Sequence, residues 1–563
     1  MSFTLDAYAA RSCPLKTVNL FTPNLVAPSL ERPDPPFFRD ADAIEAEVMA
    51  AVLGGPGRVV DLRPLREGPS ADAEAACLEA LASGADVVIA GLLPKDEVAH
   101  RRGRPSLLVR SRGEGGGYHP VQVKFHRVLE ADPDGEPLDV ASLTTPRRPV
   151  MVTGRRFRWG SRLNAALQMA HYWRLLEACG YAARIPWAGL VGIDKIALDP
   201  EHPGQVEQVI TWLNLGQERV PPDPRHLDRP EDAEPVSTLA RYDDEHRYRV
   251  ELAQAALASS GQDQLLTPIV SGECRGCVWQ EHCQTQLDAD DLSLRITKAP
   301  LDVHEVRTLR RLGISTVAEL AHADLDDLLG QYLPRASHRV GSEERLRRAH
   351  RRATLMDAGV QLERQTQGPL DLPRHDLEID VDIETSSDDR VYLWGFWVDD
   401  PSRGEPYGRQ FATFADLDDA AELDLARRAL GWLRQVVAGR DAAVYHYSDY
   451  EVIRLNRLAH RLGEVGTWAT TWAADGFVDL FEVVRRNYFG ANGLGLKVVT
   501  AAVTGFAWRD EDPGGLNSQS WFAEAVGDPD ERVRELARVR VLEYNEDDVR
   551  ATWHLRRWLR EQA

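Results

Sequence analysis

Acidic and apolar residues alternate without a break in the segment Leu377-Glu378-Ile379-Asp380-Val381-Asp382-Ile383-Glu384. In a β-strand, residues two apart lie on the same face, so this pattern predicts one apolar face and one face that carries four carboxylates. Like charges on one face repel each other, and a bound cation would relieve that repulsion. The segment alone is equally compatible with a solvated edge strand. The choice therefore depends on whether other carboxylates could join a cation site.

Two later segments supply such carboxylates. Glu451 lies at the start of a predicted helix, directly after a predicted strand. Tyr544 and Asp548 are four residues apart in the last predicted helix, so they share one of its faces. The carboxylates of Glu451 and Asp548, together with those of Asp382 and Glu384, form a set of oxygen ligands of the kind that Mg²⁺ and Mn²⁺ prefer.

The elements that must position these residues alternate between strands and helices, which predicts an α/β domain over residues 371–563. The expected strands are 377–384, 391–398 and 442–447, and the expected helices are 419–438, 449–462 and 533–558.

In this order, Asp382-Ile383-Glu384, His446-x3-Tyr450-Glu451 and Tyr544-x3-Asp548 resemble the three exonuclease motifs of the DEDD superfamily, in its tyrosine-containing branch. More narrowly, the domain is similar to RNase H-like exonucleases that are fused to RecB-like domains, and it shares segments such as Val478-Asp479-Leu480 and Gly495-Leu496-Lys497 with them. The resemblance implies an RNase H-like fold. It also implies an enzyme that hydrolyses phosphodiester bonds with two Mg²⁺ or Mn²⁺ ions about 4 Å apart.

The same resemblance implies roles for individual residues. Asp382 would bridge both ions, Glu384 and Asp548 would hold the ion that generates hydroxide, and Tyr544 would orient the attacking water. Glu451 departs from the usual Asp of the second motif, and Asp449 is the rival ligand there. We expect Glu378 and Asp380 to support the site from outside or to be solvated.

Cys274, Cys277 and Cys283 have the metal-ligand spacing C-x2-C-x5-C, and Cys13 lies far upstream; together they are four of the six cysteines. The first residues lack the apolar core of a secretory signal, so we expect a cytoplasmic protein and metal binding rather than disulfides. Thiolates in this number hold a [4Fe–4S] cluster or Zn²⁺. Cys77 and Cys179 lie in apolar helical contexts and are expected in the core.

Residues 1–285 resemble the RecB-type nucleases that carry an Fe–S cluster, a branch that includes CRISPR-associated exonucleases. The cysteine arrangement carries this resemblance, together with Gln168-x3-Tyr172 and with Lys124, one of only six lysines in the chain. It implies a PD-(D/E)xK nuclease fold and favours a [4Fe–4S] cluster over Zn²⁺.

The acidic residues of that nuclease motif are replaced here. Ser106 stands where the family has Asp, and Gln122 stands where it has Asp or Glu. Neither supplies anionic charge to Mg²⁺, so we expect a nuclease fold that has lost its metal site. The alternative is that other acids serve, such as Asp86 or Glu45.

Basic and backbone features favour a nucleic-acid partner. Arg155, Arg156 and Arg158 form a basic patch that could follow a phosphate backbone, although a solvated loop would look the same. Around Gly313, residues 306–320 resemble a helix-hairpin-helix unit, whose backbone N–H groups would contact a phosphate; a plain helical linker fits as well. The net charge of −21 excludes only a global positive field.

The sequence thus predicts an α/β multidomain protein with three parts: a degenerate Fe–S nuclease domain at 1–285, a helical linker at 286–370 and an RNase H-like exonuclease domain at 371–563. No run of about 18 apolar residues occurs, so no membrane span is expected. We expect a metal-dependent 3′–5′ exonuclease acting on DNA, with DNA favoured over RNA and a helicase as a partner suggested by resemblance. The alternative is a nucleic-acid-binding scaffold in which both nuclease sites are silent.

Overall fold

The computed structural model describes residues 3–28, 36–113, 115–199, 201–202, 204–223, 225, 234–259, 264–336, 339–415 and 417–562. The chain forms two compact units. Unit 1 comprises residues 1–294, 302–314 and 326–343, and unit 2 comprises residues 295–301, 315–325 and 344–563. The boundary passes several times through the middle of the chain, and the division into three parts at residues 285 and 370 stays a prediction.

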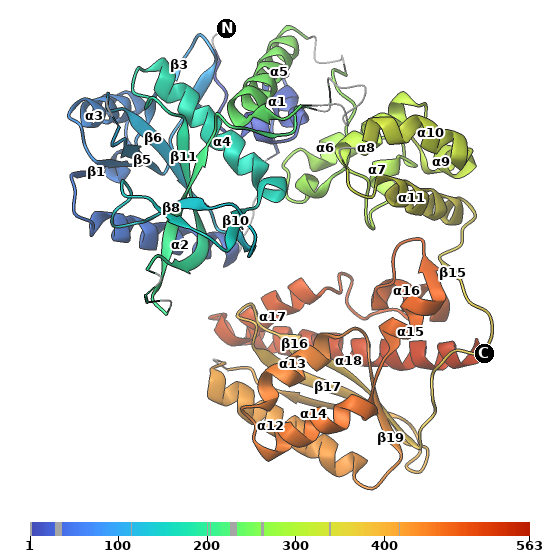
Figure 1. Ribbon diagram of the computed structural model, residues 1–563. Helices are drawn as coiled ribbons and strands as arrows, with labels where there is room; N and C mark the ends of the chain where they lie inside the picture. Colours follow the sequence, from blue (N-terminus) through green and yellow to red (C-terminus); the bar gives the residue numbers. More distant parts are fainter. Residues whose placement is uncertain are drawn as a thin grey trace. The chain divides into compact units, whose positions relative to one another are not determined.

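Unit 1 is built on an eight-stranded mixed sheet in the order β1-β2-β5-β6-β11-β12-β8-β9 (Figure 1). Its strands are β1 (Val59–Asp61), β2 (Val87–Ile89), β5 (Leu107–Arg110), β6 (Tyr118–Val123), β8 (Leu138–Ser142), β9 (Val150–Val152), β11 (Trp187–Ala197) and β12 (Val206–Asn214). Strand β6 is antiparallel to β5 and parallel to β11. Short two-stranded pairs flank this sheet: β3 (Leu93–Asp96) with β4 (Arg101–Gly103), β7 (Leu129–Ala131) with β10 (Arg155–Phe157), and β13 (Glu218–Val220) with β14 (Val236–Ser237).

Helices cover both faces of this sheet. On one face, α4 (Trp159–Ala178) contributes Met169, Ala170 and Leu176 to a large buried core. On the other face, α2 (Pro36–Leu53) contributes Val48 and Met49 to a second core with the side chains of β6 and β12. The remaining helices of this part of the chain are α1 (Pro14–Phe21), α3 (Ser70–Ala82), α5 (Thr238–Ala258), α6 (Gln280–Gln284) and α7 (Leu292–Arg295).

The middle of the chain is helical, as the apolar spacing predicts. It contains α8 (Val303–Arg311), α9 (Val317–His322), α10 (Leu325–Ala336) and α11 (Ser342–Asp357). Helices α8 and α9 each begin with a capping box, formed by Asp302 with Glu305 and by Thr316 with Glu319, which satisfies backbone N–H groups that would otherwise lack acceptors.

Unit 2 contains a five-stranded sheet in the order β18-β17-β16-β19-β20. Its central strand is β16 (Leu377–Thr385), which pairs antiparallel with β17 (Val391–Asp399) and parallel with β19 (Ala442–His446). The outer strands are β18 (Tyr407–Ala412) and β20 (Phe477–Asp479), and β15 (Leu362–Arg364) forms a separate pair with β21 (Tyr488–Gly490).

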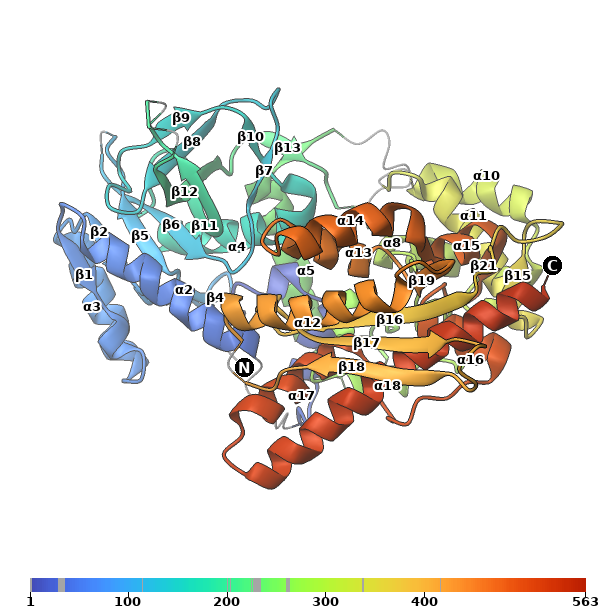
Figure 2. The same ribbon diagram turned by 90° about the horizontal axis from the view of Figure 1, so that it is seen from below.

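Different helices cover the two faces of the unit 2 sheet (Figure 2). Helices α12 (Asp419–Val437), α13 (Tyr450–Ala459) and α14 (Glu464–Gly476) pack on the apolar side chains of β16 in one core. Helices α17 (Gly515–Gly527) and α18 (Glu531–Glu561) pack on the acidic face, while α15 (Leu480–Asn487) and α16 (Leu496–Thr504) complete the unit. The acidic alternation therefore belongs to a central strand that is buried on both faces, and the interpretation as a solvated edge strand is wrong.

The predicted strands and helices of unit 2 occur within a few residues of their expected bounds, with α18 longer than expected at both ends. In the part of the chain that the structure describes, no helix is long and apolar enough to cross a membrane.

Candidate metal centre

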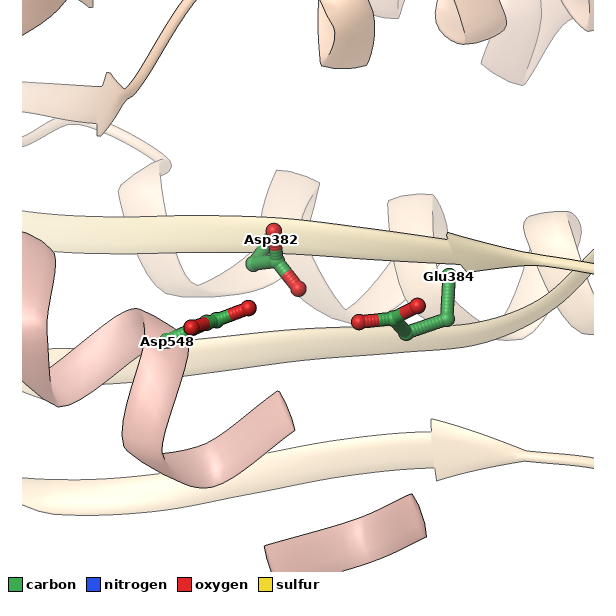
Figure 3. Close-up of side chains that lie close together, drawn as sticks. All are labelled: Asp382, Glu384 and Asp548. Atoms are coloured by element: carbon green, nitrogen blue, oxygen red, sulfur yellow. The ribbon is translucent and has the colours of Figure 1, made fainter. Parts of the chain in front are cut away.

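Three carboxylates converge between β16 and α18. Asp382 and Glu384 extend from β16 and Asp548 extends from α18, and one oxygen of each lies within 4.8 Å of the others (Figure 3). Glu384 and Asp548 are buried and Asp382 is half-buried. Among the described residues, this group is the one that has the geometry of a metal site with three or more acidic, His or Cys ligands.

The helix approaches the strand closely because β17 carries a glycine at this level. Gly395 pairs with Asp382 across the sheet. A Cβ atom at residue 395 would lie 1.8 Å from the side-chain oxygen of Asn545, so a larger residue would push α18 away.

Each of the three carboxylates accepts a hydrogen bond from a neutral donor. Asn545 Nδ2 donates to Asp382 Oδ2 at 2.8 Å, and Trp508 Nε1 donates to Asp548 Oδ1 at 2.6 Å. Ser518 Oγ donates to Glu384 Oε2 at 2.5 Å. Such partners fix the orientation of metal ligands. Asn545 could have been found from its i, i+3 spacing to Asp548, whereas no sequence signal marks Ser518 or Trp508.

Lys497, from the first turn of α16, donates to the same site. Its Nζ lies 3.1 Å from Asp548 Oδ1 and 3.0 Å from Tyr544 Oη. It is the sole lysine among the described residues that contacts this carboxylate group. The segment Gly495-Leu496-Lys497 was expected to belong to the domain, but the contact of Lys497 with the motif residues was not predicted.

The electrostatics of the site favour a cation. Burial and the neighbouring carboxylates Glu384, Asp548 and Glu451 raise the pKa of Asp382 well above its usual value. Burial, followed by the charge of Asp548, raises the pKa of Glu384 to about 8. Burial and the same carboxylates also raise the pKa of Tyr544, so its hydroxyl stays protonated. Protons thus partly compensate a charge that a divalent ion would compensate fully.

Glu451 is buried at the start of α13, outside the group of three but close enough to raise the pKa of Asp382. Its Oε2 atom has no hydrogen-bond donor among the described residues and lies 3.6 Å from His446 Nδ1. An unsatisfied buried carboxylate oxygen is available to a cation. Asp449, the rival, is exposed and makes no capping hydrogen bond with its side chain. The geometry therefore favours Glu451 over Asp449.

The other two carboxylates of β16 are neither solvated nor part of the metal site. Arg556 of α18 donates to Asp380 at 3.0 and 2.8 Å and also contacts Glu378. Arg560 contacts Glu378 as well, at 2.6 Å through Nη1. The expectation that Glu378 and Asp380 support the site or are solvated is corrected: buried arginines neutralise both.

In unit 1, the four cysteines line one cavity: Cys13, Cys274, Cys277 and Cys283. Burial raises the pKa of Cys13 and of Cys283, and in each the nearby cysteines contribute. The Ser271 N–H lies 3.4 Å from Cys274 Sγ and Asn19 Nδ2 lies 3.7 Å from Cys283 Sγ, contacts that stabilise thiolates. Four thiols are the residue types that hold such a metal ion or cluster, whereas the geometric grouping of metal ligands among the described residues contains the three carboxylates and no cysteine. Cys77 is buried in the core as expected.

The residues of the expected degenerate nuclease site form two hydrogen-bonded groups. Lys124 Nζ donates to Gln168 Oε1 at 2.5 Å, and Gln168 Nε2 donates to Tyr172 Oη at 3.1 Å. Gln122 Nε2 donates to Ser106 Oγ at 2.8 Å. Burial and the charge of Arg11 lower the pKa of Lys124 to about 7. The amide and hydroxyl groups of these residues thus hydrogen-bond to neighbouring side chains of the same cluster, and none of the groups is a carboxylate.

The alternative acids for that site are engaged elsewhere. Asp86 forms an ion pair with Arg147 and accepts from the Arg58 backbone N–H at 3.0 Å. Glu45 forms an ion pair with Arg66 at 2.8 Å. Neither carboxylate forms an ion pair with Lys124.

Some of the groups that were expected to contact nucleic acid are bonded to other groups of the chain. Arg156 pairs with Glu130 at 2.7 Å and Arg158 lies 3.5 Å from the same carboxylate, while Arg155 is exposed on β10. Gly313 has a positive φ of 83°, and its N–H donates to Arg310 O. The N–H groups of residues 315 and 316 donate to Glu319. These backbone donors are therefore not free for a phosphate in this conformation.

A protein-family model described as the RNase H superfamily matches residues 380–560. The match spans β16 to α18 and includes all three carboxylates of the metal centre. No curated protein and no solved structure matches the chain. The C-terminal unit thus contains an RNase H-like domain of mixed α/β structure, and members of that superfamily are generally nucleases that use divalent metal ions.

Proposed function

From the premise of an RNase H-like domain at residues 380–560, we propose that this protein is a metal-dependent 3′–5′ exonuclease that acts on single-stranded ends of DNA. The observation that carries the proposal is the convergence of Asp382, Glu384 and Asp548 within 4.8 Å. Burying several carboxylates so close together raises the free energy of the folded state unless a bound cation neutralises their charge.

The residues present fit two Mg²⁺ or Mn²⁺ ions, since all candidate ligands are carboxylate oxygens. Asp382, Glu384 and Asp548 would hold them, with Glu451 as the fourth ligand through its unsatisfied Oε2. Bound there, the ions would stabilise charge on the attacking and leaving oxygens of a phosphodiester.

The chain's own residues then position the reactants. The hydroxyl of Tyr544 stays protonated and accepts a hydrogen bond from Lys497 Nζ at 3.0 Å. This contact would hold the hydroxyl in the site, where it would donate to a water or a phosphate. Trp508 and Asn545 keep the carboxylates oriented. The pairing of Tyr544 with Asp548 on one helical face supports the exonuclease assignment over other RNase H-like nucleases.

In unit 1, we assign a [4Fe–4S] cluster to the four-cysteine cavity, with Zn²⁺ as the less favoured occupant. Because Cys13 lies near the start of the chain and the other three follow α5, the cluster would link distant segments of this unit. The unit would act as a DNA-holding scaffold, and a separate helicase would be a partner that supplies single strands.

A second candidate is a nucleic-acid-binding scaffold without catalysis. It is supported by the uncharged Ser106–Gln122 pair, which stands where the resemblance would place carboxylates. The intact carboxylates of unit 2 favour the enzyme.

The two candidates are separated by incubating the purified chain with 5′-labelled single-stranded DNA in Mn²⁺, beside RNA, duplex DNA and a 3′-blocked strand. The proposal expects a ladder of products shortened from the 3′ end, and no ladder with the blocked strand. Binding without any metal-dependent cleavage would support the scaffold instead. Iron and zinc analysis of the same sample identifies the occupant of the cysteine cavity.

A further inference from the structure

A cavity of about 760 Å³ lies in unit 1, well within the range of small-ligand sites. It spans five neighbouring strands of the large sheet, at the end of β5 and β12 and at the start of β6, β8 and β11. None of the residues expected in the degenerate nuclease site lines it. His119 of the cavity lies near the start of β6 and Lys124 directly follows its end, so an extended chain places them roughly 16 Å apart.

The cavity is basic in a chain whose net charge is −21. Four arginines line it: Arg110, Arg112, Arg147 and Arg184. Arg147 pairs with Asp86, and Arg110 donates to Gly84 O at 3.1 Å. Arg112 and Arg184 are exposed, and neither has an acidic partner among the described residues. Asp139 is the one acidic residue of the lining, so the positive charges outnumber it.

The lining also contains two buried N–H groups without an acceptor among the described residues. They are Trp212 Nε1 and Arg147 Nε. The Trp212 side chain is 7% exposed, so water does not readily replace a missing acceptor. Buried donors of this kind are rare in folded proteins, because each one costs free energy unless an acceptor is supplied. Both residues line the cavity, so an acceptor-rich ligand that reaches these N–H groups would satisfy them.

Aromatic rings form the remaining wall. Trp187 and His119 line the cavity with Trp212, and the rings of His119 and Trp212 meet edge to face at 5.7 Å. His119 Nδ1 donates to Trp187 O at 3.1 Å, which leaves Nε2 as an acceptor. Indole and imidazole faces stack on nucleobases, and arginines bind phosphate oxygens.

We infer that this cavity binds a nucleotide, with the phosphate at Arg112 and Arg184 and the base against Trp187 and Trp212. The same chemistry is offered by a free nucleoside monophosphate and by one nucleotide of a single strand. The inference does not depend on the proposed nuclease activity, because it rests on other residues in unit 1.

The test is calorimetric titration of the full-length Asp382→Asn protein without added divalent ions, so that a strand is not degraded. The titrants are AMP, inorganic phosphate and a deoxyribonucleotide pentamer. We expect saturable binding of AMP or of the pentamer, and the tighter of the two identifies the source. Phosphate alone should bind at least tenfold more weakly, because it lacks the stacking ring.

Arg112→Glu with Arg184→Glu should weaken binding at least tenfold. Trp212→Phe, which replaces the indole by a smaller aromatic ring and removes its N–H, should weaken binding roughly tenfold. The matched control is Arg247→Glu, an exposed arginine of α5 outside the cavity, which should bind as the parent does. Thermal unfolding of each variant checks its fold. Absence of binding, equal binding by the double variant, or equal affinity for phosphate and AMP would overturn the inference. None of these outcomes bears on cleavage by unit 2, which is measured separately.

Discussion

Arg556 and Asp380 form a two-fold hydrogen-bonded ion pair between α18 and β16, with Nε 3.0 Å from Oδ1 and Nη2 2.8 Å from Oδ2. Both side chains are fully buried. This pair divides the acidic face of β16: arginines neutralise its first half, and its second half is left with the acidic cluster. Burial still raises the pKa of Asp380 to about 6 against the lowering effect of Arg556.

Replacing Arg556 by Met should strongly destabilise the protein, because it leaves Asp380 buried without its partner and leaves Glu378 with Arg560 alone. Loss of one member of a buried pair typically costs about 3–5 kcal/mol in the free energy of unfolding. Denaturant unfolding measures this loss. Arg557→Met, one residue further along and exposed, is the matched control and should change stability by less than about 0.5 kcal/mol. Equal effects of the two variants would contradict a neutralising role for Arg556.

The sequence pattern singled out the three carboxylates that the structure brings together, Asp382, Glu384 and Asp548, but not this division. Alternation in 377–384 and the spacing of Tyr544 and Asp548 are local, so they could be recognised without the fold. The spacing of the arginine partners follows from the axial rise of each element. Two residues of a strand advance about 6.6 Å along its axis, and four residues of a helix advance about 6 Å. Glu378 and Asp380 therefore meet Arg560 and Arg556, four apart on the antiparallel α18. That match needs the packing partner of β16 to be known, which local pattern does not supply.

Other residues of the site come close to the carboxylates only through the tertiary fold. Trp508 lies in the loop between α16 and α17 and reaches Asp548, while Ser518 of α17 reaches Glu384. Neither has a spacing that marks it in advance.

Removing an oriented donor should weaken the enzyme without abolishing it. Trp508→Phe keeps an aromatic side chain but removes the indole N–H that reaches Asp548 at 2.6 Å. Loss of such a partner typically costs roughly 10–100-fold in metal affinity or activity. Cleavage rates across a Mn²⁺ titration measure the loss. Trp553→Phe, whose N–H donates to Asp399 outside the metal centre, is the control; similar losses in both variants would count against a role for Trp508 at the metal.

Stabilisation by Mn²⁺ should grow as pH rises from 6 to 8. The pKa of Glu384 is raised to about 8 from an ordinary value of 4.5, so between these values the folded metal-free chain keeps a proton that the unfolded chain has lost. Its stability therefore falls with rising pH in that window, whereas metal binding needs the deprotonated carboxylates and strengthens. The measurement is Tm with and without Mn²⁺ at several pH values. A shift in Tm that does not depend on pH, or one that Glu384→Gln leaves unchanged, would contradict the assignment.

Glu451 and Asp449 should differ in their effect on cleavage. Glu451→Gln removes a buried anionic oxygen beside Asp382 and should slow cleavage by more than roughly tenfold. Asp449→Asn alters an exposed side chain and should leave the rate within about twofold. Initial rates at saturating Mn²⁺ compare the two. The reverse order of effects would make Asp449 the ligand.

We propose that the chain has one working nuclease site, at the carboxylates of unit 2. The most direct test is the rate of mononucleotide release from a single-stranded DNA with a free 3′ end, in Mn²⁺, for the parent chain, Asp382→Asn and Lys124→Met. Loss of a metal ligand should cost more than the roughly 100-fold upper range for its hydrogen-bond partners, so Asp382→Asn should be inactive in this assay. Lys124→Met, in the cluster without carboxylates, should release nucleotides at the parent rate per folded molecule. Unchanged release by Asp382→Asn, or loss of release in Lys124→Met with its fold intact, would contradict the account.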